Sequence, residues 1–342
     1  MAGLVAAVEA TERGADVLLL EKAEAVGGSM RLSSGVVWRY RDLQRFREEC
    51  PGGDPALQRV VHEAVDRDIV WLERLGARVL EHSTGNPQTR GVRFSVPSLV
   101  RALAARVRNL RLREPLRELP VGAPVILATG GFQAERGLVR RHITQEADAL
   151  LLRATPWSTG DGLRLGLEAG AAASDGMGEF YGRNMPAPPA RVRPVQFVDL
   201  AQLYAHHATV VNAAGESYEP QSWSEIDVVQ WTARQPGARA TYRVMRDRLS
   251  DRVRERTVGS MIEAAERAGA VVTRKATVEI EVVAGITTTL GGLKVDSRAR
   301  AADGVFAAGC DVGGISTGGY SSGLAAALVL GRRAAAAALE EA

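Results

Sequence analysis

The sequence predicts an α/β protein built on a Rossmann-like dinucleotide-binding sheet, with a second domain inserted in the middle of the chain. Three observations support this fold class. The chain opens with a helix, a short apolar strand and an acidic residue over residues 2–21. A strand at 125–128 runs into Thr129 and a pair of glycines at 130 and 131. A strand at 304–308 enters a glycine-rich loop at 309–323, and a terminal helix follows it.

The opening segment resembles the second half of a βαβ unit. Residues 2–13 form the expected helix, which Gly14 ends in the position that favours glycine. Residues 16–20 are expected as a short strand, because Val17 to Leu20 form an apolar run that is typical of a buried parallel strand. A complete dinucleotide fingerprint reads strand, G-x-G-x-x-G, helix, strand, acid, and here only its last glycine, Gly3, remains. Glu21 follows Gly3 by 18 residues, close to the spacing at which a carboxylate binds ribose hydroxyls.

Two turns of small residues follow the acidic residue. Val26 to Ser29 reads V-G-G-S, and Leu32 to Gly35 reads L-S-S-G. Such turns let the backbone approach a bulky cofactor closely. The alternative is that both are ordinary surface loops.

Two further glycine-rich segments lie at expected strand ends, where α/β sheets place their ligand crevice. Leu127 to Phe132 reads L-A-T-G-G-F. The loop from Gly309 to Gly323 contains six glycines and Asp311, and a helix begins directly after it. The N–H groups at the start of that helix can bind an anionic or polar cofactor edge.

The composition changes in the middle of the chain. Prolines and aromatic residues concentrate between about 177 and 240, and the periodic pattern loosens. We therefore expect a cofactor-binding domain formed by residues 1–176 and 282–342, and a substrate-capping α+β domain formed by 177–281. Other helices are expected at 54–76, 96–108, 160–170 and 257–268.

Charge and cysteine content exclude several function classes. The net charge is only +3, and the arginines are scattered among acidic residues, which argues against nucleic-acid binding. The two cysteines, Cys50 and Cys310, lie in no metal-binding spacing, so no metal site and no disulfide are expected. No run of 18 apolar residues predicts a membrane span, and no signal peptide opens the chain. A reducing cytoplasmic location is expected.

Taken in order, five segments resemble the flavoprotein family of fumarate reductases and succinate dehydrogenases, which also includes ketosteroid dehydrogenases and tricarballylate dehydrogenase-like enzymes. The segments are EKAEAVGGSMRLSSGVVW, ILATGGF, STGDGLRLGLEAGA, GITTTLGGLKVD and GVFAAGCDVGGISTGGYSSGLAAALVLGR. The resemblance covers nearly the whole chain. It implies FAD as the cofactor and a small-molecule substrate.

The resemblance also implies where FAD would bind. Glu21 would hold the adenosine ribose, Ser29, Ser34 and Gly35 would line the pyrophosphate and flavin, and the backbone at Ser322 to Leu324 would face the pyrimidine end of the flavin. Asp311 could provide the ribityl contact, because Cys310 replaces the acid that many relatives carry. The full set of expected cofactor-binding residues is Gly3, Glu21, Lys22, Gly27, Gly28, Ser29, Ser33, Ser34, Gly35, Ala128, Thr129, Gly130, Gly131, Asp161, Gly309, Asp311, Ser322, Gly323 and Leu324.

The sequence departs from fumarate reductases at two positions that a dicarboxylate substrate would need. Thr288 stands where those enzymes carry a histidine, and Tyr320 stands where they carry an arginine. Fumarate and succinate are therefore not expected as substrates. Ketosteroid dehydrogenases resemble this chain in placing a tyrosine at the position of Tyr320, where it serves the substrate carbonyl. Tyr320 is expected to donate a hydrogen bond to a ketone or carboxyl oxygen, and a core tyrosine with a satisfied hydroxyl is the alternative.

The expected capping domain offers further candidates for catalysis. Arg183 and Arg234 are expected as an anion anchor or a proton donor, because a guanidinium binds carboxylates in a planar fork. Tyr181 lies beside Arg183 in the same polar segment. For each arginine, a surface salt bridge is the alternative.

Two hypotheses about activity follow. In the first, the chain is an FAD-dependent oxidoreductase that moves a hydride between flavin N5 and a CH–CH or C=C unit beside a carbonyl or carboxylate, with an unidentified electron donor or acceptor. In the second, it is a catalytically silent or N-terminally truncated flavin-fold protein with weak FAD binding. The missing first strand and first two glycines motivate the second hypothesis, and Met1 is then an internal methionine of a longer motif.

Overall fold

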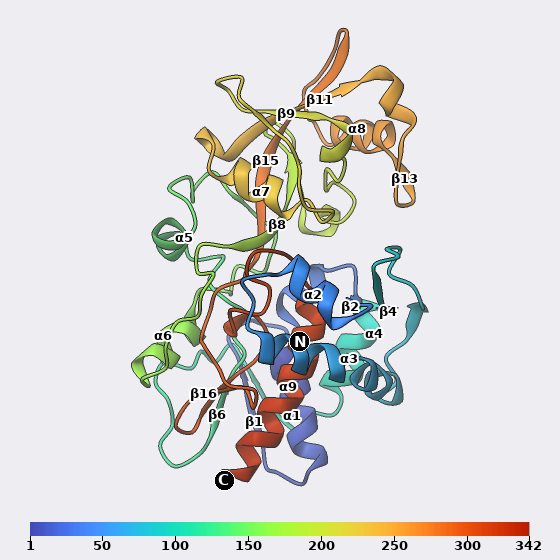
Figure 1. Ribbon diagram of the computed structural model, residues 1–342. Coiled ribbons are helices and arrows are strands. Elements are labelled where there is room, and N and C mark those ends of the chain that lie inside the picture. Colours follow the sequence, from blue (N-terminus) through green and yellow to red (C-terminus); the bar gives the residue numbers. More distant parts are fainter. Residues whose placement is uncertain (342) are drawn as a thin grey trace. The chain divides into compact units, whose positions relative to one another are not determined.

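A computed structural model describes residues 1–341 of the chain (Figure 1). These residues divide into two units. The first unit comprises Met1–Glu135, Thr155–Glu179 and the chain from Thr288 onward, and the second comprises Arg136–Ala154 and Phe180–Thr287. The second unit therefore includes residues 136–154, which the expected boundaries had assigned to the cofactor-binding domain. Whether the second unit caps a substrate stays a prediction.

The first unit is a mixed α/β structure. Its α-helices are α1 (Ala2–Glu12), α2 (Leu43–Glu49), α3 (Pro55–Arg74), α4 (Val96–Ala104), α6 (Asp161–Glu168) and α9 (Gly323–Glu340). Two short 3₁₀ turns, η1 (Gly28–Leu32) and η6 (Gly309–Asp311), lie in the segments expected to approach the cofactor. The terminal helix that the sequence predicts is thus confirmed as α9.

Three small sheets complete the first unit. Two of them contain parallel pairs, as a Rossmann-like fold requires: β1 with β5, and β17 with β6, to which β16 adds an antiparallel edge. The third sheet, β2–β4–β3, is antiparallel. The strands are β1 (Leu18–Glu21), β2 (Val36–Tyr40), β3 (Val79–Glu81), β4 (Thr89–Phe94), β5 (Asn109–Leu112), β6 (Val125–Leu127), β16 (Arg300–Ala302) and β17 (Val305–Ala307).

Helices α1 and α9 pack closely against each other in the first unit. Their contact is made of small side chains, with Ala6, Ala10 and Ala335 in one buried cluster. A Cβ atom added at Gly331 would lie 2.9 Å from the carbonyl oxygen of Ala2, so this position requires glycine. The abundance of alanine and glycine therefore has a structural use here, because it lets helix backbones approach.

An ion-pair network ties α9 to α1 and α3. The Arg332 guanidinium donates to Glu9 at 2.6 Å and to the buried carboxylate of Asp68, and it lies 4.6 Å from the centre of the Trp71 ring. Burial raises the pKa of Asp68, and the charge of Arg332 acts in the opposite direction. Arg332 and Arg333 both lie within α9 and do not interrupt it. The charge of Arg332 is compensated by the carboxylates of Glu9 and Asp68.

The second unit is built around one large sheet. Its order is β10–β9–β11–β15–β14, with β7 and β8 also pairing with β15. Its strands are β7 (Leu151–Leu152), β8 (Phe180–Pro186), β9 (Thr209–Val211), β10 (Ser217–Tyr218), β11 (Arg239–Met245), β12 (Arg252–Val253), β13 (Arg256–Thr257), β14 (Val272–Arg274) and β15 (Thr277–Thr289), whose last two residues belong to the first unit. The helices are α5 (Arg136–His142), α7 (Ile226–Ala233) and α8 (Val258–Arg267), with 3₁₀ turns at η2 (Pro194–Gln196), η3 (Ala205–His207), η4 (Pro236–Ala238) and η5 (Arg246–Ser250).

Aromatic side chains form the core of the second unit. Tyr204 and Tyr242 are both fully buried, and their rings meet edge to face at 5.5 Å. Around them pack apolar residues of β11, β15 and α8, among them Val244, Ile280 and Met261. The sequence is rich in aromatic residues in this region. Some of them are there because they form the buried core of the second unit.

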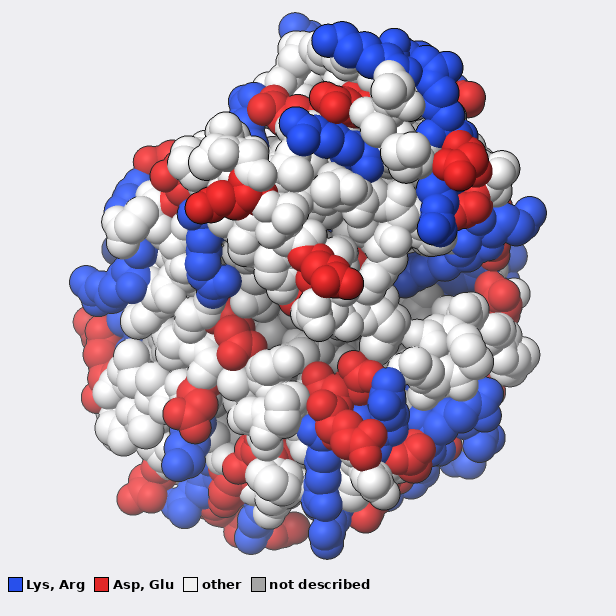
Figure 2. Space-filling model, turned by 45° about the horizontal axis from the view of Figure 1, so that its top comes forward, with Lys and Arg blue, Asp and Glu red and all other residues white. Residues whose placement is uncertain are grey.

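Charges of both signs are interspersed over the face drawn in Figure 2. In the structure, many charged side chains are paired at short distances, for example Arg239 with Glu281 at 2.6 Å and Arg274 with Glu266 at 2.7 Å. Within residues 1–341, no helix combines the length and apolar character that crossing a membrane requires.

Candidate functional site

The candidate cofactor site lies at the carboxyl ends of the parallel strands in the first unit. β1 ends at Glu21, β6 leads into the turn from Ala128 to Gly131, and β17 leads into η6. Parallel pairing places the ends of β6 and β17 side by side. The fold thus brings together two of the glycine-rich segments that the sequence singled out.

Gly3 provides the close packing that the last glycine of a dinucleotide fingerprint supplies. A Cβ atom added at Gly3 would lie 3.4 Å from Cβ of Ala128 and 3.5 Å from Cδ1 of Leu19. The residue therefore allows the first turn of α1 to approach both β1 and the turn after β6. Its role here is helix–strand packing.

Glu21 and Lys22 lie at the end of β1, and both are partly exposed. The Glu21 carboxylate accepts a hydrogen bond from the N–H of Ala23 at 2.9 Å. Lys22 donates to the Thr159 hydroxyl at 2.5 Å and forms an ion pair with Asp161. Lys22 therefore connects the end of β1 to Asp161 at the start of α6, and contact of either residue with FAD stays a prediction.

Asp311 holds the two strand ends together. Its side chain is 1% exposed, and it accepts hydrogen bonds from the N–H of Thr129, from the Thr129 hydroxyl at 3.0 Å and from the N–H of Gly131 at 3.1 Å. Burial raises the pKa of this carboxyl, and the donors from Thr129 and Gly131 act in the opposite direction. The carboxylate is thus committed to shaping the turn, and a ribityl contact would need a change in this arrangement.

The turn from Thr129 to Gly131 depends on glycine. Gly130 and Gly131 have φ angles of 98° and 83°, in the region that disfavours other residues. A Cβ atom at Gly131 would lie 2.6 Å from Oγ1 of Thr289 and 2.8 Å from Oε1 of Gln133. The conformation is therefore fixed by backbone geometry and by the Asp311 carboxylate together.

The two small-residue turns after β1 have different structures. Gly27 has a φ of 110° and precedes η1, and Gly28 has open space where a Cβ atom would lie. Ser29 accepts a hydrogen bond from the N–H of Thr155 at 3.1 Å. The Ser33 hydroxyl stabilises the turn in which it lies. It donates a hydrogen bond to the carbonyl oxygen of Met30 and accepts one from the N–H of Gly35.

The loop from Gly309 to Gly323 ends at the N-terminus of α9. Ser322 is the N-cap of this helix, and its hydroxyl accepts from the N–H of Ala325 at 3.2 Å. Gly323 is exposed, and a Cβ atom added there would meet nothing within 4 Å. The first N–H groups of an α-helix lack intrahelical partners, so this end can bind a polar cofactor edge.

Replacing Ser322 by alanine is expected to lower the free energy of unfolding by about 1 kcal/mol, because the α9 N-cap loses its acceptor. Urea-induced unfolding measures this change. Ser297, which is exposed, provides the control: its replacement by alanine should leave stability within about 0.5 kcal/mol of the original. An unchanged midpoint for the Ser322 variant would show that the cap contributes little.

These features fit FAD. Two turns leave space where side chains would otherwise stand, at Gly28 and Gly323, so a large planar cofactor can approach the backbone. Glu21 supplies a carboxylate for ribose hydroxyls, and α9 supplies N–H donors. The available donors are the N–H groups at the start of α9, nearby hydroxyls and the Lys22 ammonium group, and all of them can bind the polar edges of flavin or a pyrophosphate.

Comparison with known proteins identifies the family. The chain matches the FAD binding domain family over residues 1–96 and 43–324. It belongs to this family. FAD is therefore the cofactor of the chain, and the resemblance stated from the sequence motifs is confirmed.

Among curated proteins, the chain is similar to a fumarate reductase (cytochrome) of Shewanella frigidimarina, with 26% identity over 223 residues. The match covers 51% of this chain and 39% of that protein. The chain thus matches well under half the length of this curated relative. The match therefore relates one part of that fumarate reductase to this chain.

Solved structures show the same fold. The open conformation of a flavocytochrome c3 fumarate reductase superimposes with a TM-score of 0.74 at 19% identity, covering 99% of this chain and 76% of that one. A 3-ketosteroid-Δ4-(5α)-dehydrogenase from Rhodococcus jostii RHA1, in complex with 4-androstene-3,17-dione, gives 0.71 at 18% identity, covering 98% and 94%. The α/β FAD-binding fold is therefore confirmed.

Tyr320 belongs to the first unit and lies three residues before α9. Its carbonyl oxygen accepts a hydrogen bond from the Tyr40 hydroxyl at 2.7 Å, and its ring lies edge to face with Trp38 at 5.5 Å. The residue is partly exposed. The backbone and ring of Tyr320 are thus both held by the β2 strand.

Thr288, at the position of the fumarate reductase histidine, also belongs to the first unit. Its hydroxyl donates to the carbonyl oxygen of Thr289 at 3.2 Å and hydrogen-bonds with the Cys310 thiol. Burial raises the pKa of that thiol. Both side chains are therefore occupied with each other and with the backbone.

The remaining expected catalytic residues belong to the second unit. Arg183 is 6% exposed, donates to the carbonyl oxygen of Ser224, and lies 5.1 Å from the centre of the Tyr181 ring. Arg234 is exposed at the end of α7 and donates to the carbonyl oxygen of Gln230 at 3.3 Å. The surface salt bridge considered for Arg183 is ruled out, because the guanidinium is buried.

Two buried charged residues of the second unit were not singled out from the sequence. Arg153 is 8% exposed and donates to the Thr287 hydroxyl at 2.7 Å and to the carbonyl oxygen of Phe197 at 2.9 Å. Glu225 is 7% exposed and lies at the start of α7. Neither residue belongs to a recognisable motif. An acidic residue directly before a helix is usually expected to be exposed to solvent at the helix N-terminus.

Proposed function

We propose that the chain is part of an FAD-dependent oxidoreductase acting on a CH–CH or C=C unit next to a carbonyl or carboxylate group. Bound FAD supplies two-electron hydride chemistry at its N5 atom. Family membership supports FAD as the cofactor. The position of Tyr320 in the loop directly before α9 supports a carbonyl group of the substrate as the activating group. Substrate, electron partner and cytoplasmic location stay predictions.

The protein's own residues would activate the substrate and move its second proton. We assign Tyr320 the role of donating a hydrogen bond to the carbonyl oxygen, where negative charge develops as the neighbouring C–H bond is broken or formed. Such a donor is effective only if its ring is fixed. The Trp38 contact constrains the ring, and the Tyr40 hydrogen bond holds the backbone carbonyl of Tyr320.

The second unit would contribute the charged groups. We assign Arg183 as the anion anchor or proton donor, with Tyr181 against its guanidinium. The alternative is Arg234, whose exposure leaves it accessible from solvent. Burial favours Arg183, because a charge held away from water interacts more strongly with a substrate oxygen.

Anaerobic mixing with candidate substrates tests this proposal. FAD-loaded protein should lose its flavin absorbance with 4-androstene-3,17-dione, or the chemically reduced protein should regain it with 1,4-androstadiene-3,17-dione. Both are ketones of the kind named with the structural relatives. Succinate and fumarate should leave the spectrum unchanged, because Thr288 and Tyr320 replace the groups that a dicarboxylate needs. Reaction with succinate or fumarate but not with ketones would contradict the assignment.

A further inference from the structure

The loop that carries Tyr320 is rich in glycine. Residues 313–321 read G-G-I-S-T-G-G-Y-S, directly before the N-cap of α9. Gly318 has a φ of 81°, and a glycine backbone adopts many conformations at little cost. A loop of this composition does not fix its own conformation, so the position of Tyr320 depends on contacts from outside the loop.

One set of outside contacts comes from the start of α3, in the same unit. Asp54 is the N-cap of this helix and Pro55 is its first residue, an arrangement typical of helix starts. The N–H of Asp54 donates to the carbonyl oxygen of Gly314 at 2.7 Å. The N–H of Gly52 donates to that of Thr317 at 3.0 Å. The chain entering α3 is therefore bound to the loop through its backbone.

Gln58 adds a side-chain link between the same two segments. It lies in the first turn of α3 and is only 1% exposed. Its Nε2 atom donates to the carbonyl oxygen of Cys50 at 2.9 Å and to that of Ile315 at 3.3 Å. A side-chain amide nitrogen carries two N–H groups, so one glutamine can bind both buried carbonyls. Gln58 thus joins the segment before α3 to the first half of the loop.

Cys50 extends this link to Tyr320 itself. The residue is fully buried, and its sulfur accepts a hydrogen bond from the N–H of Tyr320. A Cβ atom added at Gly319 would lie 3.0 Å from this sulfur and would collide with the carbonyl oxygen of Glu49. The two segments are therefore in close backbone contact beside Tyr320. Burial raises the pKa of the thiol to about 12, so it stays neutral around pH 7.

We propose that Gln58 is a positioning residue for Tyr320: by holding the carbonyl groups of Cys50 and Ile315 together, it fixes the backbone that carries the tyrosine. The inference rests on the proposed function, in which the Tyr320 hydroxyl binds the substrate carbonyl, and it deepens that function. Misplacing a reacting group by about 1 Å can lower a rate on the order of 10²-fold. A residue that contacts only the loop backbone can therefore change turnover.

Hydrogen–deuterium exchange of the FAD-loaded protein tests the positioning without a substrate. Gln58→Met keeps the length of the side chain and removes both N–H donors. In this variant, the backbone N–H groups of residues 313–321 should exchange at least about tenfold faster, because the loop opens more often. The increase should exceed that in the middle of α9, which reports general destabilisation. Unchanged exchange in the loop would overturn the proposal.

Turnover then tests whether the effect reaches the Tyr320 hydroxyl. With 4-androstene-3,17-dione as the probe, Gln58→Met should lower kcat about tenfold and leave the FAD dissociation constant within about threefold of the original. In a Tyr320→Phe background, the same substitution should lower kcat less than about twofold, because the hydroxyl that it positions is already absent. Equal losses in both backgrounds would overturn the proposal, since Gln58 would then act by another route.

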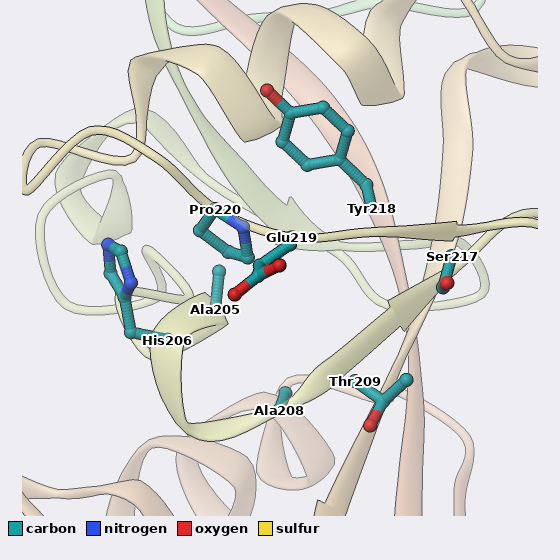
Figure 3. A pocket seen from close by; sticks show the side chains of 8 residues that line it. All are labelled: Ala205, His206, Ala208, Thr209, Ser217, Tyr218, Glu219 and Pro220. Atoms are coloured by element: carbon teal, nitrogen blue, oxygen red, sulfur yellow. The ribbon is translucent and has the colours of Figure 1, made fainter.

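Two control variants should keep both the loop exchange and the kcat of the original protein. Gln44→Met is the matched control, because Gln44 is exposed on α2 and its amide donates to Glu48 at 2.9 Å. Glu219→Gln is a control in the second unit, where this exposed residue lines a surface cavity of about 310 Å³ (Figure 3).

Gln58→Asn is the second variant if Gln58→Met does not fold. It keeps the amide on a side chain that is one CH₂ group shorter, so it should show smaller changes in the same direction. No change in either measurement for this variant would overturn the proposal.

The two measurements also separate this inference from the function on which it rests. If loop exchange rises in Gln58→Met while Tyr320→Phe keeps the original kcat, Gln58 positions the loop and the role assigned to the Tyr320 hydroxyl is wrong. If exchange is unchanged while Tyr320→Phe loses turnover, the role of the hydroxyl holds and the positioning by Gln58 is wrong.

Discussion

Replacing Tyr320 by phenylalanine is expected to lower turnover by about 10²–10³-fold while FAD stays bound. The substitution removes only the hydroxyl, which in the proposed reaction stabilises charge on the substrate carbonyl. The rest of the residue should keep its place, because the Tyr40 hydroxyl binds the Tyr320 carbonyl oxygen and the Trp38 and Tyr320 rings meet edge to face. An effect on kcat without an effect on FAD affinity is therefore the signature of the proposed role.

Steady-state turnover and a fluorescence titration with FAD measure the two quantities on the same preparation. Tyr218→Phe provides a matched control, because it removes a hydroxyl that hydrogen-bonds Asp227 in the second unit. That variant should keep full turnover. If Tyr320→Phe turns over substrate at the original rate, the hydroxyl does not activate the carbonyl, and Tyr320 is a packing residue.

Replacing Asp311 by alanine is expected to abolish tight FAD binding and to lower the free energy of unfolding by about 3 kcal/mol or more. The carboxylate accepts hydrogen bonds from two backbone N–H groups and one hydroxyl of the Thr129–Gly131 turn. Without it, these buried donors lose their acceptor, and Gly130 and Gly131 regain conformational freedom. The turn after β6 would then no longer be fixed at the strand ends.

Urea unfolding and FAD titration together test this second expectation. Asp311→Asn keeps one carbonyl oxygen as acceptor, so it should retain part of the stability and part of the affinity. Asp303→Ala, at a fully exposed position, should change neither. Loss of FAD affinity with unchanged stability would instead indicate that Asp311 contacts the cofactor directly, as the sequence interpretation proposed.

The ends of the chain could be predicted well because their patterns are local. Apolar spacing and Gly14 predicted α1, and the apolar run before Glu21 predicted the parallel strand β1. The expectation that this strand is buried was wrong, because Leu18 is 47% exposed and the rest of β1 is only partly buried. The last helix followed from the apolar run after Gly323. In each case, the residues that define the element are neighbours in sequence, so periodicity and end signals suffice.

The antiparallel sheet β2–β4–β3 was not predicted, because its pairing joins distant segments. Val36–Tyr40 pairs with Thr89–Phe94 across α2 and α3. In sequence, the first of these looks like a continuation of the glycine turn, and nothing in it specifies a partner strand. The register depends on burial that forms only in the folded unit.

The second unit shows the same limit for site residues. Sequence patterns drew attention to Arg183 and Arg234 because guanidinium groups bind anions. They could not show that Arg183 is buried against Ser224 while Arg234 is exposed, nor that Glu225 points inward. Burial of a charged side chain is set by long-range packing, which a single sequence does not display.

The structure also sharpened the interpretation of Asp311. Sequence comparison with the family pattern suggested that it might replace the acid missing at Cys310 and contact the cofactor. Its hydrogen bonds join the turn after β6 to η6, and a direct contact with the cofactor stays a prediction. The sequence could not show these hydrogen bonds, because Thr129 and Asp311 lie 182 residues apart.

A crystal structure of the FAD-loaded protein tests the central claim most directly. We expect the flavin to lie against the loop from Gly309 to Gly323, with its pyrimidine edge at the first N–H groups of α9. We expect the Tyr320 hydroxyl on the side from which N5 is reached. A flavin bound elsewhere, or a Tyr320 hydroxyl turned away from the ring into the protein core, would contradict it.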